Sequence, residues 1–187
     1  MSDSQTPQDE VQGGLTVAEK RENLIRLAFA GDEARYEAFR DAVRAALPLG
    51  ASAVIRGSAI TGERWRDGAA FDVDGPGTSD LDLTLVGEEV VRLFTSTGFF
   101  VPGVHSRPLS DEDPDVAPTL VPLRRRLMRI AGRPVNIQGS RDIVIAFRGD
   151  LLDQPYLTLV EKTDAAGEPA GGSPDLERGE PEAGSRK

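Results

Sequence analysis

The sequence predicts an α+β domain with a small mixed β-sheet flanked by helices. Two stretches with helical spacing come first, and strand-like and helix-like stretches then alternate along the chain. The chain has 187 residues with 20 Gly and 13 Pro, a loop-rich composition that argues against an all-helical bundle. Its hydrophobic fraction is 39%, which indicates that part of the chain does not pack into the core.

Composition divides the chain into a domain and two tails. Residues 1–15 are polar and predict a disordered N-terminal arm. Residues 164–187 are rich in Gly, Pro and Glu and predict a disordered acidic tail. The remaining residues, 16–163, are expected to form one domain, which is long enough to bury a core.

The first two elements are expected to be helices. Thr16 and Glu19 match the capping-box pattern, and apolar residues follow at helical spacing up to Gly31. A second helix is predicted over residues 32–47 and ends before Pro48 because proline cannot continue it.

The later elements alternate between strands and helices. Short apolar or β-branched runs predict strands at 51–56, 81–86, 99–101, 135–138 and 156–160. Helical spacing predicts helices at 88–95 and 119–131, and the apolar run 142–148 is interpreted as a strand or a helix, with a helix preferred. The 119–131 helix carries a basic cluster, interpreted either as a solvated face or as a seat for phosphates or RNA: Arg124, Arg125, Arg126, Arg129 and, just beyond it, Arg133.

Composition also excludes several classes of function. The chain has no cysteine and one histidine, so cysteine zinc sites, thiol nucleophiles and paired-histidine metal sites are excluded. The first residues do not resemble a signal peptide and no apolar run is long enough for a membrane span, so a cytoplasmic location with no membrane partner is expected. The formal net charge of −9 disfavours broad nucleic-acid binding.

Two aspartates begin the strand predicted at 81–86. Asp80 and Asp82 are two residues apart, so in a strand both carboxylates point to the same face, while Leu81 and Leu83 point to the core. Carboxylates held this close repel each other unless a cation lies between them. Hard oxygen ligands suit Mg²⁺ or Mn²⁺, with nucleotide phosphates completing the coordination.

A glycine and a serine end the strand predicted at 51–56. Gly57 lets the backbone approach an anion closely, and Ser58 offers a hydroxyl and an N–H group at the start of a helical turn. Arg56 lies beside them and has the charge to contact a triphosphate, as do Arg64 and Arg66. A phosphate site next to a metal-binding pair is the layout of metal-assisted nucleotidyl transfer.

Residues 54–58 (VIRGS) and 80–83 (DLDL) resemble the signature of the DNA polymerase β-like nucleotidyltransferase superfamily. The resemblance implies a small mixed sheet and transfer of a nucleoside monophosphate from an NTP to a hydroxyl, with release of pyrophosphate. It implies that Gly57 and Ser58 bind the triphosphate, with ATP as the expected NTP. It also implies that Asp80 and Asp82 hold divalent ions and act as the catalytic carboxylates.

The sequence departs from the family pattern at the third carboxylate. The family places it on a later strand, and the matching position here is Asn136, which can offer a carbonyl oxygen to a metal but cannot act as a base. Asp142 and Glu161 are possible substitutes. The departure leaves nucleotide binding intact as a hypothesis and puts transfer to a hydroxyl in question.

A second departure is the length of the segment between the two motifs. Residues 63–79 read as an insertion, interpreted either as a lid or as a surface loop. Trp65 within it is interpreted either as an aromatic that stacks on a base or as an anchor for the loop.

Three hypotheses follow. The first is a Mg²⁺- or Mn²⁺-dependent nucleotidyltransferase whose acceptor is a protein, an RNA or a small molecule. The second is a catalytically weakened nucleotide-binding or partner-binding module of the same fold, and the third is an interaction protein with no ligand. Larger family members have a further helical domain that holds the base, so the first two helices, a protein partner or a second copy are candidates for completing the pocket.

Overall fold

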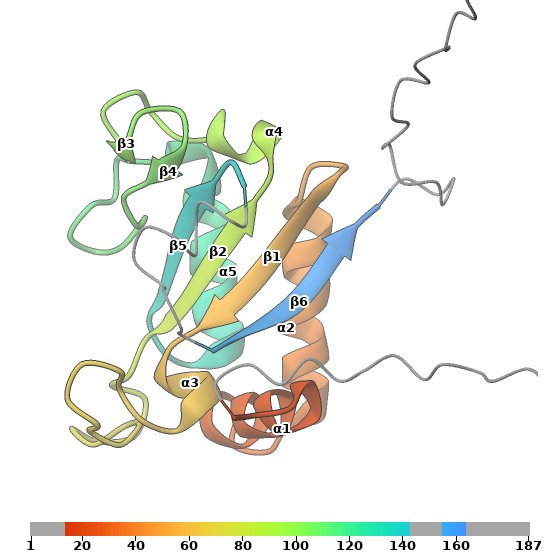
Figure 1. The fold of residues 1–187 in the computed structure, drawn as a ribbon, viewed down its shortest axis with the longest axis vertical. Coiled ribbons are helices and arrows are strands. Elements are labelled where there is room, and N and C mark those ends of the chain that lie inside the picture. Colours follow the sequence, from red (N-terminus) through yellow and green to blue (C-terminus); the bar gives the residue numbers. More distant parts are fainter. Residues whose placement is uncertain (1–13, 143–154, 164–187) are drawn as a thin grey trace, which may run out of the picture.

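The predicted α+β architecture is confirmed. The structure, a computed structural model, describes residues 14–142 and 155–163. Its strands form one six-stranded sheet in the order β3-β4-β5-β2-β1-β6, with helices packed against it (Figure 1). The predicted tails lie outside the described residues except for Gly14 and Leu15, and so does the helix predicted at 142–148 except for Asp142.

The four longer strands lie next to one another in the sheet. β1 (Ala51–Arg56) pairs antiparallel with both β2 (Leu81–Val86) and β6 (Tyr156–Lys162). β2 pairs parallel with β5 (Val135–Ser140), so the sheet is mixed. All four strands were expected from the sequence, although β5 and β6 each run two residues further.

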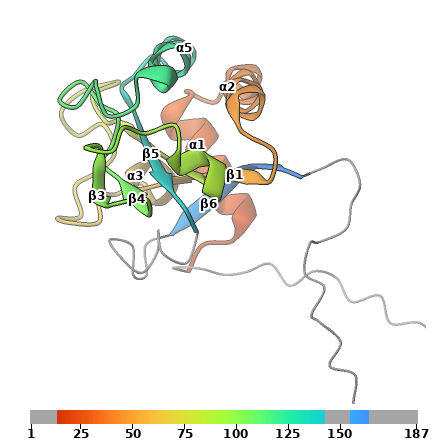
Figure 2. The same ribbon diagram turned by 90° about the horizontal axis from the view of Figure 1, so that it is seen from above.

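The three long helices are α1 (Val17–Ala28), α2 (Glu33–Ala46) and α5 (Val121–Ala131). Figure 2 shows α2 and α5 on one face of the sheet, whereas α1 lies across the end of the sheet, below the strands in Figure 1. The predicted capping box of α1 is present: the Thr16 hydroxyl accepts from the Glu19 amide at 3.2 Å, and the Glu19 carboxylate accepts from the Thr16 amide at 2.8 Å. No helix within residues 14–142 and 155–163 is long and apolar enough to cross a membrane.

Alternation along β2 separates the core from a polar face. Leu81, Leu83 and Leu85 are fully buried and belong to the same hydrophobic cluster as side chains of the three long helices. Asp82 and Thr84 therefore point to the opposite face of the sheet.

The short elements differ most from the sequence-based expectation. α4 (Glu88–Val91) ends well before the predicted 88–95: the Leu93 and Phe94 amides donate to carbonyls three residues back, and the Thr95 amide donates to the Val116 carbonyl. β3 (Phe99–Val101) was expected, but its partner β4 (His105–Ser106) has two residues and was not. A 3-10 turn, Pro118–Leu120, precedes α5, and the one-turn helix α3 (Ser58–Thr61) follows β1.

The insertion 63–79 is anchored to the domain by an ion pair. Asp72, which has a positive φ of 58°, accepts from both terminal nitrogens of Arg133 at 3.0 and 3.1 Å and from the Gly77 and Ser79 amides at 2.9 Å. Arg133 also donates to backbone carbonyls at the end of α1 and stacks on the Phe71 ring at 4.5 Å. These contacts favour a fixed surface insertion over a lid.

The ion pair should make stability depend on pH in the acid range. Burial alone would raise the pKa of Asp72, but the bonds from Arg133 and the two amides outweigh it and lower that pKa from 3.8 to about 2. A carboxyl whose pKa is lowered on folding stabilises the protein above its ordinary pKa. This stabilisation is lost as the pH falls from about 4 through about 2.

We expect Asp72→Asn to lower the free energy of unfolding by about 2 kcal/mol at pH 7, and by less as the pH approaches 3. Denaturant unfolding at pH 7, 4 and 3 measures this. Asp74→Asn is the matched control, because the Asp74 side chain is 76% exposed and lies 3.8 Å from its partner Arg64. An equal effect of both substitutions would contradict the anchoring role of Asp72.

Candidate functional site

Three strand ends bring the predicted site residues together. Arg56 at the end of β1 lies opposite Asp82 at the start of β2, and Asp82 lies opposite Asn136 at the start of β5. Asp80 immediately precedes β2 and is exposed, whereas Asp82 is half-buried. The side chains of Arg56, Asp82 and Asn136 share the face of the sheet opposite the leucine core.

Asn136 lies between the two carboxylates. Its side-chain nitrogen donates to Asp80 Oδ2 and, at 3.4 Å, to Asp82 Oδ1. An amide nitrogen has two hydrogens, so one side chain can serve both carboxylates. This arrangement reduces the repulsion between Asp80 and Asp82 without adding the negative charge that a third carboxylate would bring.

The environment of Asp82 favours its protonated form. Burial raises the pKa of Asp82 above its ordinary value, and the neighbouring charge of Asp80 adds to this. Arg56 and the hydrogen bond from Asn136 act in the opposite direction but do not cancel the effect of burial. A carboxyl in this state gains most from a cation that would stabilise its ionised form.

Arg56 is held against the polar face of the sheet. Its Nη2 donates to Gln138 Oε1 at 2.8 Å, and Gln138, which is 7% exposed, donates in turn to the Ser106 carbonyl at 3.3 Å. Arg56 Nε is buried and has no hydrogen-bond partner among the described residues. The sequence did not indicate Gln138 or Ser106, because their roles depend on the pairing of β4 with β5.

Gly57 brings the backbone after β1 against the carboxylate pair. Its φ is +85°, and a Cβ built on it would lie 3.4 Å from Asp82 Oδ2. A side chain at this position would therefore be strained by the backbone conformation and would be in van der Waals contact with Asp82. Ser58 follows as the first residue of α3, and its hydroxyl makes no hydrogen bond within the described residues.

Neither candidate substitute for the third carboxylate reaches the site. Asp142 follows the far end of β5, six positions after Asn136, which is about 20 Å along an extended strand. Glu161 pairs with Ser52, near the start of β1, whereas the site is at the end of that strand. The direction of the strands therefore shows that neither Asp142 nor Glu161 takes the position of the third carboxylate.

The predicted basic residues are mostly engaged elsewhere. Arg64 pairs with Asp67 and Asp74 inside the insertion, and the Arg66 side chain is 85% exposed. In the α5 cluster, Arg124 is buried and donates to the Val135 carbonyl at 2.6 Å, and Arg133 anchors the insertion. The reading of that cluster as a single solvated or phosphate-binding face is therefore wrong for Arg124 and Arg133, while the other three arginines are exposed.

The donor set fits a hard divalent cation with few protein ligands. Within the described residues, no group of three or more His, Cys, Asp or Glu side chains is placed to hold a metal ion. Asp80 and Asp82 supply two carboxylates, and Asn136 would supply an amide oxygen if its terminal amide turned over. Mg²⁺ is commonly bound by one or two carboxylates plus substrate phosphates, so this set matches its chemistry.

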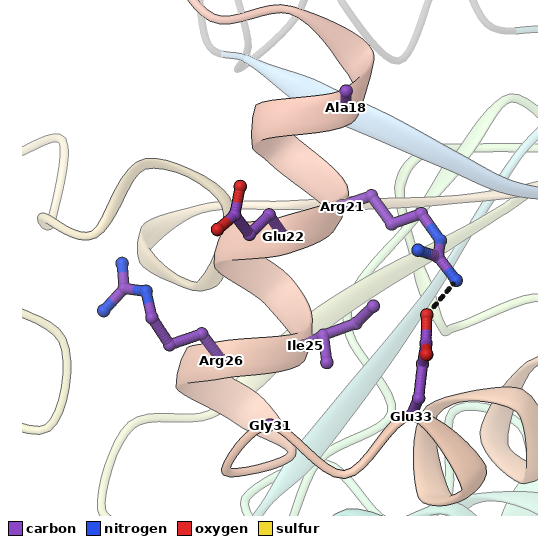
Figure 3. A pocket seen from close by; sticks show the side chains of 7 residues that line it. All are labelled: Ala18, Arg21, Glu22, Ile25, Arg26, Gly31 and Glu33. Carbon is purple, nitrogen blue, oxygen red and sulfur yellow. Dashed lines mark hydrogen bonds and ion pairs between the residues drawn. The ribbon is translucent and has the colours of Figure 1, made fainter.

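A groove lies along α1 and contains none of the residues at the three strand ends. It has a volume of about 510 Å³ and is lined by Ala18, Arg21, Glu22, Ile25, Arg26, Gly31 and Glu33. Figure 3 shows Arg21 reaching across to Glu33, with 2.9 Å between nitrogen and oxygen. Its charges alternate in sign and include none of the predicted site residues, so the groove offers no convergent set of catalytic groups.

No protein-family model, curated protein or solved structure matches this chain. The carboxylate pair, Asn136, Arg56 and the Gly57 turn are therefore the features from which a function can be inferred.

The charge of Asp82 should destabilise the metal-free protein. A carboxyl whose pKa is raised on folding costs stability above that raised pKa, and the cost disappears as the pH falls below the ordinary value of 3.8. We expect Asp82→Asn to raise the melting temperature in EDTA by about 2–4 °C at pH 7 and by less at pH 4. Asp115→Asn, at an exposed carboxylate, is the control. A lower melting temperature for Asp82→Asn would show that this charge is stabilising.

Proposed function

We propose that this chain is a metal-dependent nucleotidyltransferase that moves a nucleoside monophosphate from an NTP to an acceptor hydroxyl. The observation that carries the proposal is the contact between the Gly57 turn and Asp82, within the row formed by Arg56, Asp82 and Asn136. It supports the resemblance of residues 54–58 and 80–83 to the polymerase β-like superfamily. The NTP and the cation are both cytoplasmic, which is the location we expect for the chain.

The residues of the site divide into a phosphate side and a carboxylate side. The Gly57 turn and Ser58 would bind the triphosphate, because Gly57 has no side chain to keep a phosphate from its backbone and the Ser58 hydroxyl has no partner within the described residues. Arg56 would add positive charge, which its bond to Gln138 holds beside Asp82. Asp80 and Asp82, with the Asn136 amide oxygen, would hold the Mg²⁺ or Mn²⁺.

The bound cation would supply charge neutralisation on the phosphates and polarise the reacting oxygens. In the reaction the acceptor oxygen forms a bond to the α-phosphorus, the bond from that phosphorus to the β-bridging oxygen breaks, and pyrophosphate leaves. The acceptor hydroxyl loses its proton to solvent, because Asn136 is not a base. The chain's own contribution is to orient the triphosphate between Arg56 and the carboxylate pair.

A nucleotide-binding module with little or no chemistry is the second candidate. Asn136 favours it, because its amide donates to both carboxylates and no other carboxylate among the described residues takes the third position. Such a module would bind metal and NTP and pass the signal to a partner. The acceptor of the first candidate remains a protein, an RNA or a small molecule.

Pyrophosphate release tests the proposed activity. We expect release from at least one of the four NTPs in Mg²⁺ or Mn²⁺, with the ribose hydroxyls of the NTP available as acceptors. The Asp80→Ala/Asp82→Ala double variant and Asp82→Asn should both abolish it, because each removes a carboxylate ligand. Full activity in Asp82→Asn would contradict the site assignment.

Restoring the missing carboxylate separates the two candidates. Asn136→Asp should raise pyrophosphate release by about 10²-fold or more, because it supplies a general base and a third charged ligand. Asn136→Ala is the matched control and should not raise it. If Asn136→Asp binds Mg²⁺ and NTP in a thermal-shift assay but releases no pyrophosphate, the binding module is the better description.

A further inference from the structure

Trp65 does not anchor the insertion that carries it. Its exposed fraction is 62%, among the highest of the large apolar residues, whereas Phe71 in the same insertion is 9% exposed. Phe71 packs under Arg133, and Asp72 forms the ion pair that attaches the insertion to the domain. Folding of the insertion therefore does not explain why a large aromatic side chain is exposed at this position.

The backbone around Trp65 is nevertheless fixed. Glu63 and Ala70 form a β-bridge, the Arg64 amide donates to the Ala69 carbonyl at 2.7 Å, and the Gly68 amide donates to the Arg64 carbonyl at 2.8 Å. Trp65 therefore lies within a hydrogen-bonded turn whose ends are held together. Because the backbone of this turn is already ordered, a ligand that binds the Trp65 ring costs little backbone conformational entropy.

Trp65 lines a shallow depression that adjoins the candidate site. The other residues lining it are Gly57, Thr61, Glu63 and Pro155. Gly57 lines the depression and also adjoins the candidate site, because a Cβ on it would lie 3.4 Å from Asp82 Oδ2. The depression therefore adjoins the proposed triphosphate site at Gly57.

We propose that Trp65 is the platform on which the base of the bound nucleotide stacks. This inference rests on the proposed function, because it places the triphosphate at the Gly57 turn. The Glu63 carboxylate at the same depression repels phosphates, so the uncharged base rather than the phosphate chain faces Trp65. Every base has a π-face, so the platform accepts all four bases, and purines, with the larger rings, bind more tightly.

The composition of the chain provides a direct probe. Trp65 is the one tryptophan in the sequence, so intrinsic tryptophan fluorescence reports on this residue alone. We expect quenching when the full chain is titrated with ATP or GTP in Mg²⁺, and less with UTP or CTP. Inorganic tripolyphosphate in Mg²⁺ should bind the carboxylate and glycine side without quenching, because it has no base.

Variants distinguish stacking from a general effect on binding. Calorimetric titration of Trp65→Ala should show about tenfold or weaker affinity for ATP with Mg²⁺ and unchanged affinity for tripolyphosphate. Trp65→Phe should recover most of the affinity. Phe100→Ala is the matched control, because Phe100 is 59% exposed and lies in β3 at the opposite edge of the sheet from β6.

The outcomes separate this inference from the proposed function. If neither ATP nor tripolyphosphate binds in an Asp80- and Asp82-dependent manner, the proposed function fails and the platform fails with it. If ATP binds in that manner but leaves Trp65 fluorescence and the Trp65→Ala affinity unchanged, only the platform is overturned. In that case the exposed ring is left as a surface for a protein partner.

Discussion

Repulsion between two neighbouring carboxylates is the constraint on which this structure's polar side depends. Asp80 and Asp82 are fixed two residues apart by the start of β2, and burial of Asp82 makes the repulsion stronger. Two neighbouring side chains reduce this repulsion: the uncharged Asn136 from β5 and the positively charged Arg56 from β1. Arg56 in turn requires Gln138 and the short strand β4 behind it. The order of the strands therefore also places these uncharged and positive side chains next to the carboxylate pair.

The local features of the fold were predictable from the sequence because their causes are local. The Thr16 capping box, the leucine alternation of β2 and the end of β1 at Gly57 are each determined by residues within a few positions. α4 is shorter than predicted, and the sequence around it could not show this, because the Thr95 amide bonds the carbonyl of Val116, 21 residues away. The two-residue β4 has no pattern of its own and exists through pairing alone.

The candidate site was predictable in its motifs and not in its surroundings. The Gly57 turn and the carboxylate pair were expected to be neighbours, and Asn136 was expected beside them; the strand register places them so. Asp142 and Glu161 could not be judged from the sequence, because only strand direction shows that they lie at the other end of the sheet. Arg133, assigned from the sequence to a cluster read as a solvated face or a phosphate or RNA seat, is the buried centre of the insertion's attachment.

The attachment of the insertion has a mechanical consequence. Arg133 contacts the carbonyls that end α1, the Asp72 carboxylate and the Ser79 carbonyl, and Ser79 is followed directly by Asp80. One guanidinium thus joins a helix end, a loop and the residue preceding the carboxylate pair. Because the same guanidinium holds the insertion and the end of α1, we expect the two to exchange their amide hydrogens as a single cooperative unit.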